Sequence, residues 1–248
     1  MQPGELILGI EISNPSAAGA SDRSGPGVAI ARASTPGAAE VLGVEMLRPV
    51  SGRGGHDDDL MPAIDRLCAG LRLAPAGLRS GGLARVAVST GPGGYTSLRV
   101  AVAAAKMIAE ATGARVVDVP TSMVVAAPLR PALFPCAIVL ASKGVTAWVE
   151  VLDTPARVRS GALCDAAGLA ALDGAGVRTM VADHFLPASM RDGAAALGWT
   201  VREPEFDPGA CAALGAALPA IDGADLLPRY PREPDAVTLW RQRKGASG

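Results

Sequence analysis

A Gly-Pro-Gly-Gly stretch at residues 91–94 has the residue types of an anion-binding loop. Residues 85–90 before it are rich in valine and predict a strand, and residues 98–112 after it are rich in alanine and predict a helix. Thr96 or Ser97 can cap that helix. A glycine-rich turn between strand and helix directs free N–H groups at a bound anion, and we expect Gly93 and Gly94 to adopt backbone angles that a residue with a Cβ resists. A tight turn with a good cap is the alternative that spacing alone leaves open.

A nucleotide site would need a metal-binding carboxylate and backbone loops that hold phosphate. No Lys-Ser or Lys-Thr follows the glycines, so the stretch is not a P-loop. The first predicted strand ends in the run 11–15 (Glu-Ile-Ser-Asn-Pro), in which Pro15 removes one backbone donor. The candidate nucleotide-binding residues are Glu11, Ser13, Gly91, Gly93, Gly94 and Thr96.

Metal-dependent and nucleophilic catalysis have less support. His56 beside three aspartates could hold a metal, but consecutive helix residues point in different directions, which favours a solvated helix start. His184 is far from His56 in the sequence, and neither lies near a nucleophilic-serine pattern. The cysteines are widely spaced and predict packing roles: Cys68, Cys136, Cys164 and Cys211. We therefore expect no catalytic residue and no metal ligand.

Composition limits the classes of protein further. The chain has 248 residues, enough for one large domain or two small lobes. Its net charge of −1 gives no overall attraction to nucleic acid, and with 3% aromatic residues the core must be aliphatic. We find no secretory signal and no apolar run of membrane-spanning length, which predicts a cytoplasmic protein.

The predicted strands and helices form two successive groups along the chain, and each group contains both kinds of element. Runs at 6–12, 28–32 and 41–47 predict an antiparallel meander, followed by a helix from His56 to Arg72. The pattern starts again at Arg115, with a hairpin around Lys143-Gly144. Further helices are predicted at 163–172, 188–197 and 208–218. These patterns predict an N-terminal lobe at 1–113, a C-terminal lobe at 114–218 and a tail at 219–248 that ends with basic residues.

The stretch from Gly91 to Arg99 resembles the G-P-G-S-F-T-G-L-R signature of the bacterial TsaB (YeaZ) family. Gly94, Tyr95 and Ser97 replace the family's Ser, Phe and second Gly. The order of the other segments matches as well. The resemblance is dense over residues 56–127 and thin over residues 155–219.

The resemblance implies an α/β fold of the two-lobed actin/sugar-kinase/heat-shock-chaperone (RNase H-like) type, with mixed sheets flanked by helices. In that superfold a nucleotide lies between the lobes on two turns. The second turn corresponds to 141–143 (Ala-Ser-Lys), which lacks the acidic residue often found in TsaB relatives. Together with Pro15, this argues against an active ATPase. We expect no cofactor in the isolated chain, and ATP or ADP only in a complex.

The function that the resemblance implies is that of a scaffold subunit. TsaB proteins are non-catalytic partners in the complex that makes threonylcarbamoyladenosine in tRNA. The implied partner is a TsaD-like catalytic subunit, with a TsaE-like ATPase as a possible further partner and tRNA reached only through the complex. Two alternatives stay open: an ATP-dependent kinase or ATPase of the same superfold, and a stand-alone homodimer.

Two predicted helices flank the loop, at 56–72 and 98–112. The first has a Leu/Ile stripe, and the second is apolar nearly all round, so it must be covered on more than one side. In TsaB relatives this pair packs against the equivalent pair of the catalytic subunit, or forms a homodimer without it. The predicted partner-interface residues are Leu60, Ile64, Leu67, Val100, Ala103, Ala104, Met107 and Ala111. The alternative is that the protein's own sheet and helices cover both faces.

Overall fold

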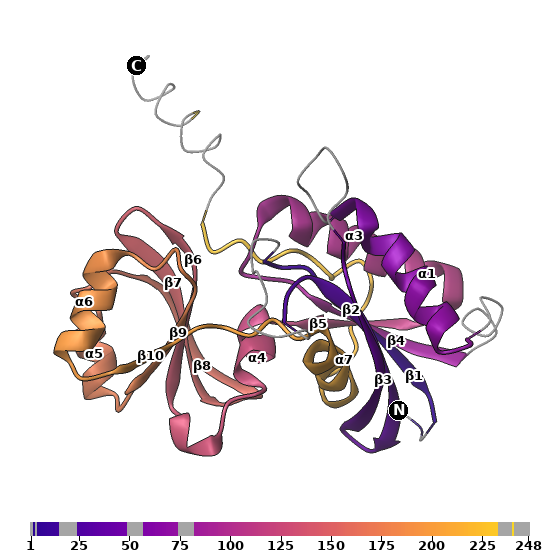
Figure 1. Cartoon of the computed structure of the whole chain (residues 1–248), viewed down its shortest axis with the longest axis horizontal. Helices are drawn as coiled ribbons and strands as arrows, with labels where there is room; N and C mark the ends of the chain where they lie inside the picture. Colours follow the sequence, from indigo (N-terminus) through magenta and orange to yellow (C-terminus); the bar gives the residue numbers. More distant parts are fainter. Residues whose placement is uncertain are drawn as a thin grey trace.

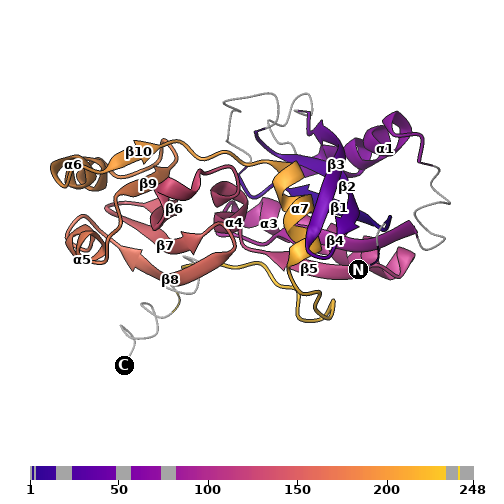
Figure 2. The same ribbon diagram turned by 90° about the horizontal axis from the view of Figure 1, so that it is seen from below.

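A computed structural model of the chain describes residues 2, 4–14, 24–48, 57–73, 82–232 and 240. These residues form two lobes, each built on a five-stranded mixed sheet (Figures 1 and 2). His56 and the basic residues of the tail, Arg241, Arg243 and Lys244, lie outside the described residues. None of the described helices combines the length and the apolarity that a bilayer crossing requires.

The first sheet has the strand order β3-β2-β1-β4-β5. Strands β1, β2 and β3 pair antiparallel, as the predicted meander required, whereas β4 and β5 run parallel to β1. The strands are β1 (Leu6–Glu11), β2 (Gly27–Thr35), β3 (Ala38–Met46), β4 (Leu83–Ser89) and β5 (Arg115–Val119).

The two faces of the first sheet carry side chains of different size, because successive strand residues point to opposite faces. Large residues such as Leu8 and Ile10 face α1 (Leu60–Gly70) and α3 (Tyr95–Thr112). Mainly small residues, together with Ile7, face α7 (Pro208–Ala217), which covers the other side of the sheet (Figure 1). The small residues in this contact are Gly9, Ala29, Ala31, Ala87, Ala212 and Gly215. The sheet therefore approaches α7 more closely than it could with larger side chains.

The second sheet has the order β10-β9-β6-β7-β8, and the predicted hairpin joins β6 to β7. Its strands are β6 (Cys136–Lys143), β7 (Thr146–Thr154), β8 (Arg157–Cys164), β9 (Thr179–Ala182) and β10 (Thr200–Arg202). The flanking helices are α5 (Leu169–Gly174) and α6 (Ala188–Ala196). The helix predicted at 163–172 was wrong in its first half, because residues 163–164 pair with β7 as the end of β8 and residues 165–168 form a turn before α5.

The sheets divide the chain at other places than the predicted boundaries. Strand β5 follows residue 113 but pairs with β4 in the first sheet, and α7 packs on that sheet although it was predicted in the C-terminal lobe. The chain crosses between the lobes after β5, where α4 (Thr121–Ala126) begins, and again between β10 and α7. Helix α4 contacts both lobes, since Val124 belongs to the core of the first and Val125 to that of the second.

Candidate functional site

The glycine-rich loop lies at the carboxyl ends of β4 and β5, the two parallel edge-side strands of the first sheet. Gly91 has a φ of +116° and a cis peptide bond to Pro92. The Gly91 N–H donates to the Thr121 hydroxyl over 3.1 Å, and the Gly91 carbonyl accepts from the Thr121 N–H over 3.0 Å. The Gly94 N–H donates to the Ser13 carbonyl over 2.7 Å. These two N–H groups are thus bonded within the protein and are not directed at an anion.

Helix α3 begins earlier than its sequence predicted. Tyr95 is its first residue, and Gly94 is the N-cap without a side-chain hydrogen bond. The predicted caps therefore lie inside the first turn, where Thr96 is exposed and Ser97 is buried. Gly94 itself is extended, with a φ of −66° and a ψ of 128°, so the unusual backbone angles predicted for it are wrong.

Glu11 ends β1 and is fully buried, with 0% of its surface exposed. The N–H and the hydroxyl of Ser13 donate to the Glu11 Oε1 over 2.8 and 2.5 Å. Oε2 has no hydrogen-bond partner among the described residues. Burial raises the pKa of the Glu11 carboxyl, and hydrogen bonds from Ser13 and Ser89 oppose part of this shift. Through its bonds to Ser13, the Glu11 carboxyl stabilises the turn that follows β1. Because it is fully buried, it does not reach a cation bound to phosphate in the solvent.

The raised pKa of Glu11 leads to a test of its environment. Its usual value is 4.5, so the folded protein binds this proton more tightly than the unfolded chain. The resulting stability is complete below that value and is lost as pH rises through the raised pKa. We expect the free energy of unfolding to decline over this interval in the wild type, and Glu11→Gln to lack that part of the decline.

Urea unfolding at a series of pH values measures this difference. Glu203→Gln, which changes an exposed side chain, is the matched control and should follow the wild type. Parallel curves for all three proteins would contradict the assignment of a strained, buried carboxyl to Glu11.

A cavity of about 200 Å³ lies where the two lobes meet beside the loop. Its walls come from both predicted phosphate turns, from the loop, and from residues that follow β9 and β10. They are Asn14, Pro92, Gly93, Gly94, Leu140, Ala141, Ser142, Asp183, Phe185 and Phe206. Sites for drug-sized ligands usually measure about 300–1,000 Å³. The cavity therefore has room for a phosphate-sized group but not for a whole nucleotide.

Asp183 is the acidic residue of the second lobe that the sequence alone did not reveal. It follows β9 rather than β6, and these two strands are parallel, so their carboxyl ends share one edge of the sheet. Burial raises the pKa of the Asp183 carboxyl, while the Phe185 N–H, the His184 charge and a hydrogen bond from Asn14 oppose the shift. The bond from Asn14 links the two lobes across the cavity. Asp183 directly follows the apolar, strand-like run at residues 177–182, and this position was the sequence signal that could have found it.

The histidine and cysteine side chains considered from the sequence do not form a second site among the described residues. Nowhere in the described part of the chain do three or more His, Cys, Asp or Glu side chains gather as metal ligands. The His184 ring packs on Phe185, with 3.9 Å between the ring centroids. All four cysteines are free; three are buried, and Cys164 is half-buried. Their predicted packing role agrees with this burial.

The residues predicted for the partner interface fall into two groups in the structure, one buried in the core and one on the outer side of α3. Leu60, Ile64 and Leu67 are buried against the first sheet, with 2%, 6% and 5% exposed, and Ala104 is buried on the inner side of α3. These four residues form core and not surface, because the apolar stripe of α1 is the face that the sheet covers. For them the alternative interpretation was correct.

The other predicted interface residues lie on the outer side of α3. Ala103, Met107 and Ala111 are exposed there at helical spacing, and Val100 is half-buried. Met107 is 54% exposed, and Tyr95, which is 50% exposed, lies on the same outer side nearer the loop, with the exposed Arg99 between it and Ala103. Helix α3 thus has an apolar side on the sheet and an outer side on which Ala103, Met107 and Ala111 form an apolar row beside the exposed Thr96, Arg99 and Glu110.

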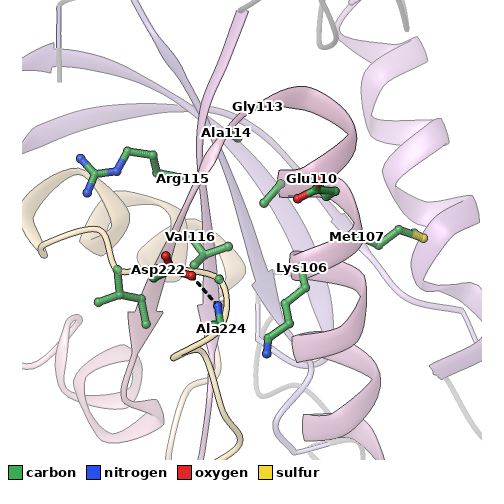
Figure 3. A pocket seen from close by; sticks show the side chains of 12 residues that line it. Lys106, Met107, Glu110, Gly113, Ala114, Arg115, Val116, Asp222 and Ala224 are labelled. Carbon is green, nitrogen blue, oxygen red and sulfur yellow. Dashed lines mark hydrogen bonds between the residues drawn. The ribbon is translucent and has the colours of Figure 1, made fainter.

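An open hollow of about 1010 Å³ lies at the C-terminal end of α3 (Figure 3). Side chains of α3, β5 and residues 221–224 line it, among them Lys106, Met107, Glu110, Arg115 and Asp222. The Asp222 carboxylate accepts the Ala224 N–H over 2.8 Å. Charges of both signs line the hollow, so it favours no single small ion. Met107 belongs both to its wall and to the outer stripe of α3.

A family model described as TsaD, tRNA N6-adenosine threonylcarbamoyltransferase, matches residues 48–177, which is more than half of the chain. The chain belongs to the TsaD family. No curated protein matches it in a sequence search.

Two solved structures share the fold of this TsaD-family chain over nearly its whole length. One is an uncharacterized protein with similarity to peptidase YEAZ from Pseudomonas aeruginosa, with a TM-score of 0.61, 15% identity and coverage of 92% of this chain and 100% of that one. The other is YeaZ from Pseudomonas aeruginosa, with a TM-score of 0.59, 16% identity and coverage of 91% and 99%. The predicted two-lobed fold and the resemblance to YeaZ (TsaB) are confirmed.

The TsaD-family match is not spread evenly over the site. It covers α1, the loop, α3 and the β6–β7 hairpin, but neither β1 with Glu11 nor α7. The matched range therefore includes the loop and the two helices on the outer face of the first sheet, together with β6, β7 and β8 of the second sheet.

Proposed function

We propose that this chain is a scaffold subunit that binds and supports a TsaD-like catalytic subunit in tRNA threonylcarbamoyladenosine synthesis. The observation that carries the proposal is the exposed apolar stripe of α3, formed by Ala103, Met107 and Ala111 and extended by Tyr95. Membership of the TsaD family supports a place in this tRNA modification. An exposed apolar stripe of this kind is typical of a surface that another protein covers.

The chemistry of the stripe suits a helix pair as partner. Ala103 and Ala111 allow a second helix to approach closely, and Met107 adapts its shape to the surface it meets. Without the catalytic subunit, a second copy of this chain covers the same stripe and forms a homodimer. We place the complex in the cytoplasm and outside the membrane, with a TsaE-like ATPase as a further partner and tRNA contacted only through the complex.

The nucleotide of the complex, ATP or ADP, is placed at the shared interface and not in the isolated chain. The interlobe cavity of about 200 Å³ supports this placement, because it is smaller than a nucleotide site. The use of the Gly91 and Gly94 N–H groups within the protein supports it as well.

Met107→Glu tests the proposed surface. The new carboxylate would lose water in the contact without gaining a partner, so we expect binding to the catalytic subunit to weaken about 10- to 100-fold. Titration calorimetry with the TsaD protein of the same host measures the affinity, and circular dichroism verifies the fold. Ala196→Glu, an exposed position on α6 of the second lobe, is the matched control and should bind like the wild type.

Two outcomes would contradict the scaffold function. One is that the wild-type chain is monomeric at a concentration of about tens of micromolar, the range of a weak interface, and also does not bind the catalytic subunit. The other is steady ATP hydrolysis by the isolated chain, which would support the alternative of an ATP-dependent kinase or ATPase of the same superfold.

A further inference from the structure

Residues 226–232, here called the C-terminal strap, return along the first lobe toward the second (Figures 1 and 2). Leu226 anchors its beginning in the core of the first lobe, with 0% exposed. The Arg229 N–H donates to the Thr90 carbonyl over 2.7 Å, and the Arg229 guanidinium pairs with Asp118 at 2.5 Å. Thr90 also donates its hydroxyl to Asp118 over 2.6 Å. The strap is therefore held at the carboxyl ends of β4 and β5.

The strap also contacts the loop and the first turn of α3. A Cβ on Gly91 would lie 2.6 Å from the Arg229 carbonyl oxygen, so the two backbones are in direct contact. The Tyr230 ring packs on the Tyr95 ring, with 4.9 Å between the centroids. The Arg99 guanidinium lies 5.2 Å from the centroid of the Tyr95 ring. These contacts bind the strap to the loop that forms one wall of the interlobe cavity.

The last residue of the strap reaches the second lobe. The Arg232 guanidinium donates to the carbonyl and to the hydroxyl of Thr146 over 2.9 and 2.8 Å. Thr146 is the first residue of β7, at the turn of the β6–β7 hairpin. The other arm of this hairpin carries Ala141 and Ser142, which line the cavity opposite the glycines. The strap thus joins the two opposing walls of the cavity from outside.

We propose that the C-terminal strap is a clamp that sets the opening between the lobes and hence the width of the interlobe cavity. Two backbone crossings, before α4 and before α7, join the lobes and can act as a hinge. The strap restrains this hinge through one arginine, whose two hydrogen bonds can break and reform without unfolding either lobe. With the strap released, the cavity would widen and admit a group larger than phosphate. This inference does not rest on the proposed function.

Fluorescence energy transfer between the lobes tests the clamp. Dyes are attached to Ala217→Cys on α7 and Ala170→Cys on α5, both exposed, with half-buried Cys164 changed to serine. We expect one narrow transfer distribution in this parent and a broader distribution with a second, more widely separated population in Arg232→Ala. Thr146→Val removes one of the two acceptors and should give a smaller second population.

Arg159→Ala is the matched control, because it removes an ion pair with Asp153 inside the second lobe and touches no strap residue. It should leave the distribution unchanged. A folded Arg232→Ala protein with the parent's distribution would overturn the proposal. If Arg232→Ala fails to fold, the milder Thr146→Val variant decides, and an unchanged distribution there would overturn the proposal equally.

Discussion

Gly9→Val is expected to destabilise the protein by about 4 kcal/mol, beyond the usual range for an overpacked core. A Cβ at Gly9 would lie 2.6 Å from the backbone nitrogen of Ala212 and 2.8 Å from its Cα. The obstacle is helix backbone, so no side-chain rotation relieves the contact. Either α7 must move off the sheet or β1 must bend, and both changes open the core of the first lobe.

Urea or thermal unfolding measures this loss. Gly161→Val is the matched control in a strand, because its new side chain would meet mainly the side chains of Trp148 and Glu150, which can move. The double variant Gly9→Ala with Ala212→Gly should recover part of the loss of Gly9→Ala, since it removes one clashing Cβ. A Gly9→Val protein within about 0.5 kcal/mol of the wild type, the scatter of ordinary surface substitutions, would contradict the close contact.

Gly93→Ala is expected to cost about 3 kcal/mol. The added Cβ would lie 2.2 Å from the Ser13 carbonyl oxygen and 2.9 Å from the carbonyl carbon. That carbonyl also accepts the Gly94 N–H, so the loop cannot move away without losing the hydrogen bond. The sequence predicted strained backbone angles at Gly93. The structure places the positive φ at Gly91 instead and shows that Gly93 is limited by contact with the end of β1.

Calorimetric melting of Gly93→Ala and of Gly70→Ala separates this contact from the general effect of replacing glycine. A Cβ at Gly70 meets nothing within 4 Å, so that variant should melt at or slightly above the wild-type temperature. Equal melting of both variants would show that the loop does not depend on contact with Ser13.

Local patterns in the sequence were sufficient for most elements. Short apolar and β-branched runs placed β1 to β5, Lys143-Gly144 placed the β6–β7 hairpin, and the Gly-rich run placed the turn before α3. These signals are local because strand alternation, turn glycines and helix ends depend on neighbours in the chain. The two-lobed fold needed the further resemblance of residues 91–99 to a known signature.

Contacts between distant segments were decided only by the tertiary structure. Periodicity marked the stripe of Leu60, Ile64 and Leu67 as apolar but could not say whether sheet or partner covers it, since both offer the same kind of surface. Asp183 reaches the cavity because β9 pairs in parallel with β6, and that pairing depends on strands about forty residues apart.

Helix α7 is the clearest example of an element whose place in the fold the sequence did not show. Its hydrophobic residues gave no sign of which lobe it joins, because alanine and glycine suit any close helix contact. Small residues of the first sheet, such as Gly9 and Ala87, fit its close approach although they are more than a hundred residues away in the chain, so shape rather than charge or polarity places α7. The sequence alone therefore determined most of the elements and the family resemblance, and three-dimensional packing decided which lobe each element completes.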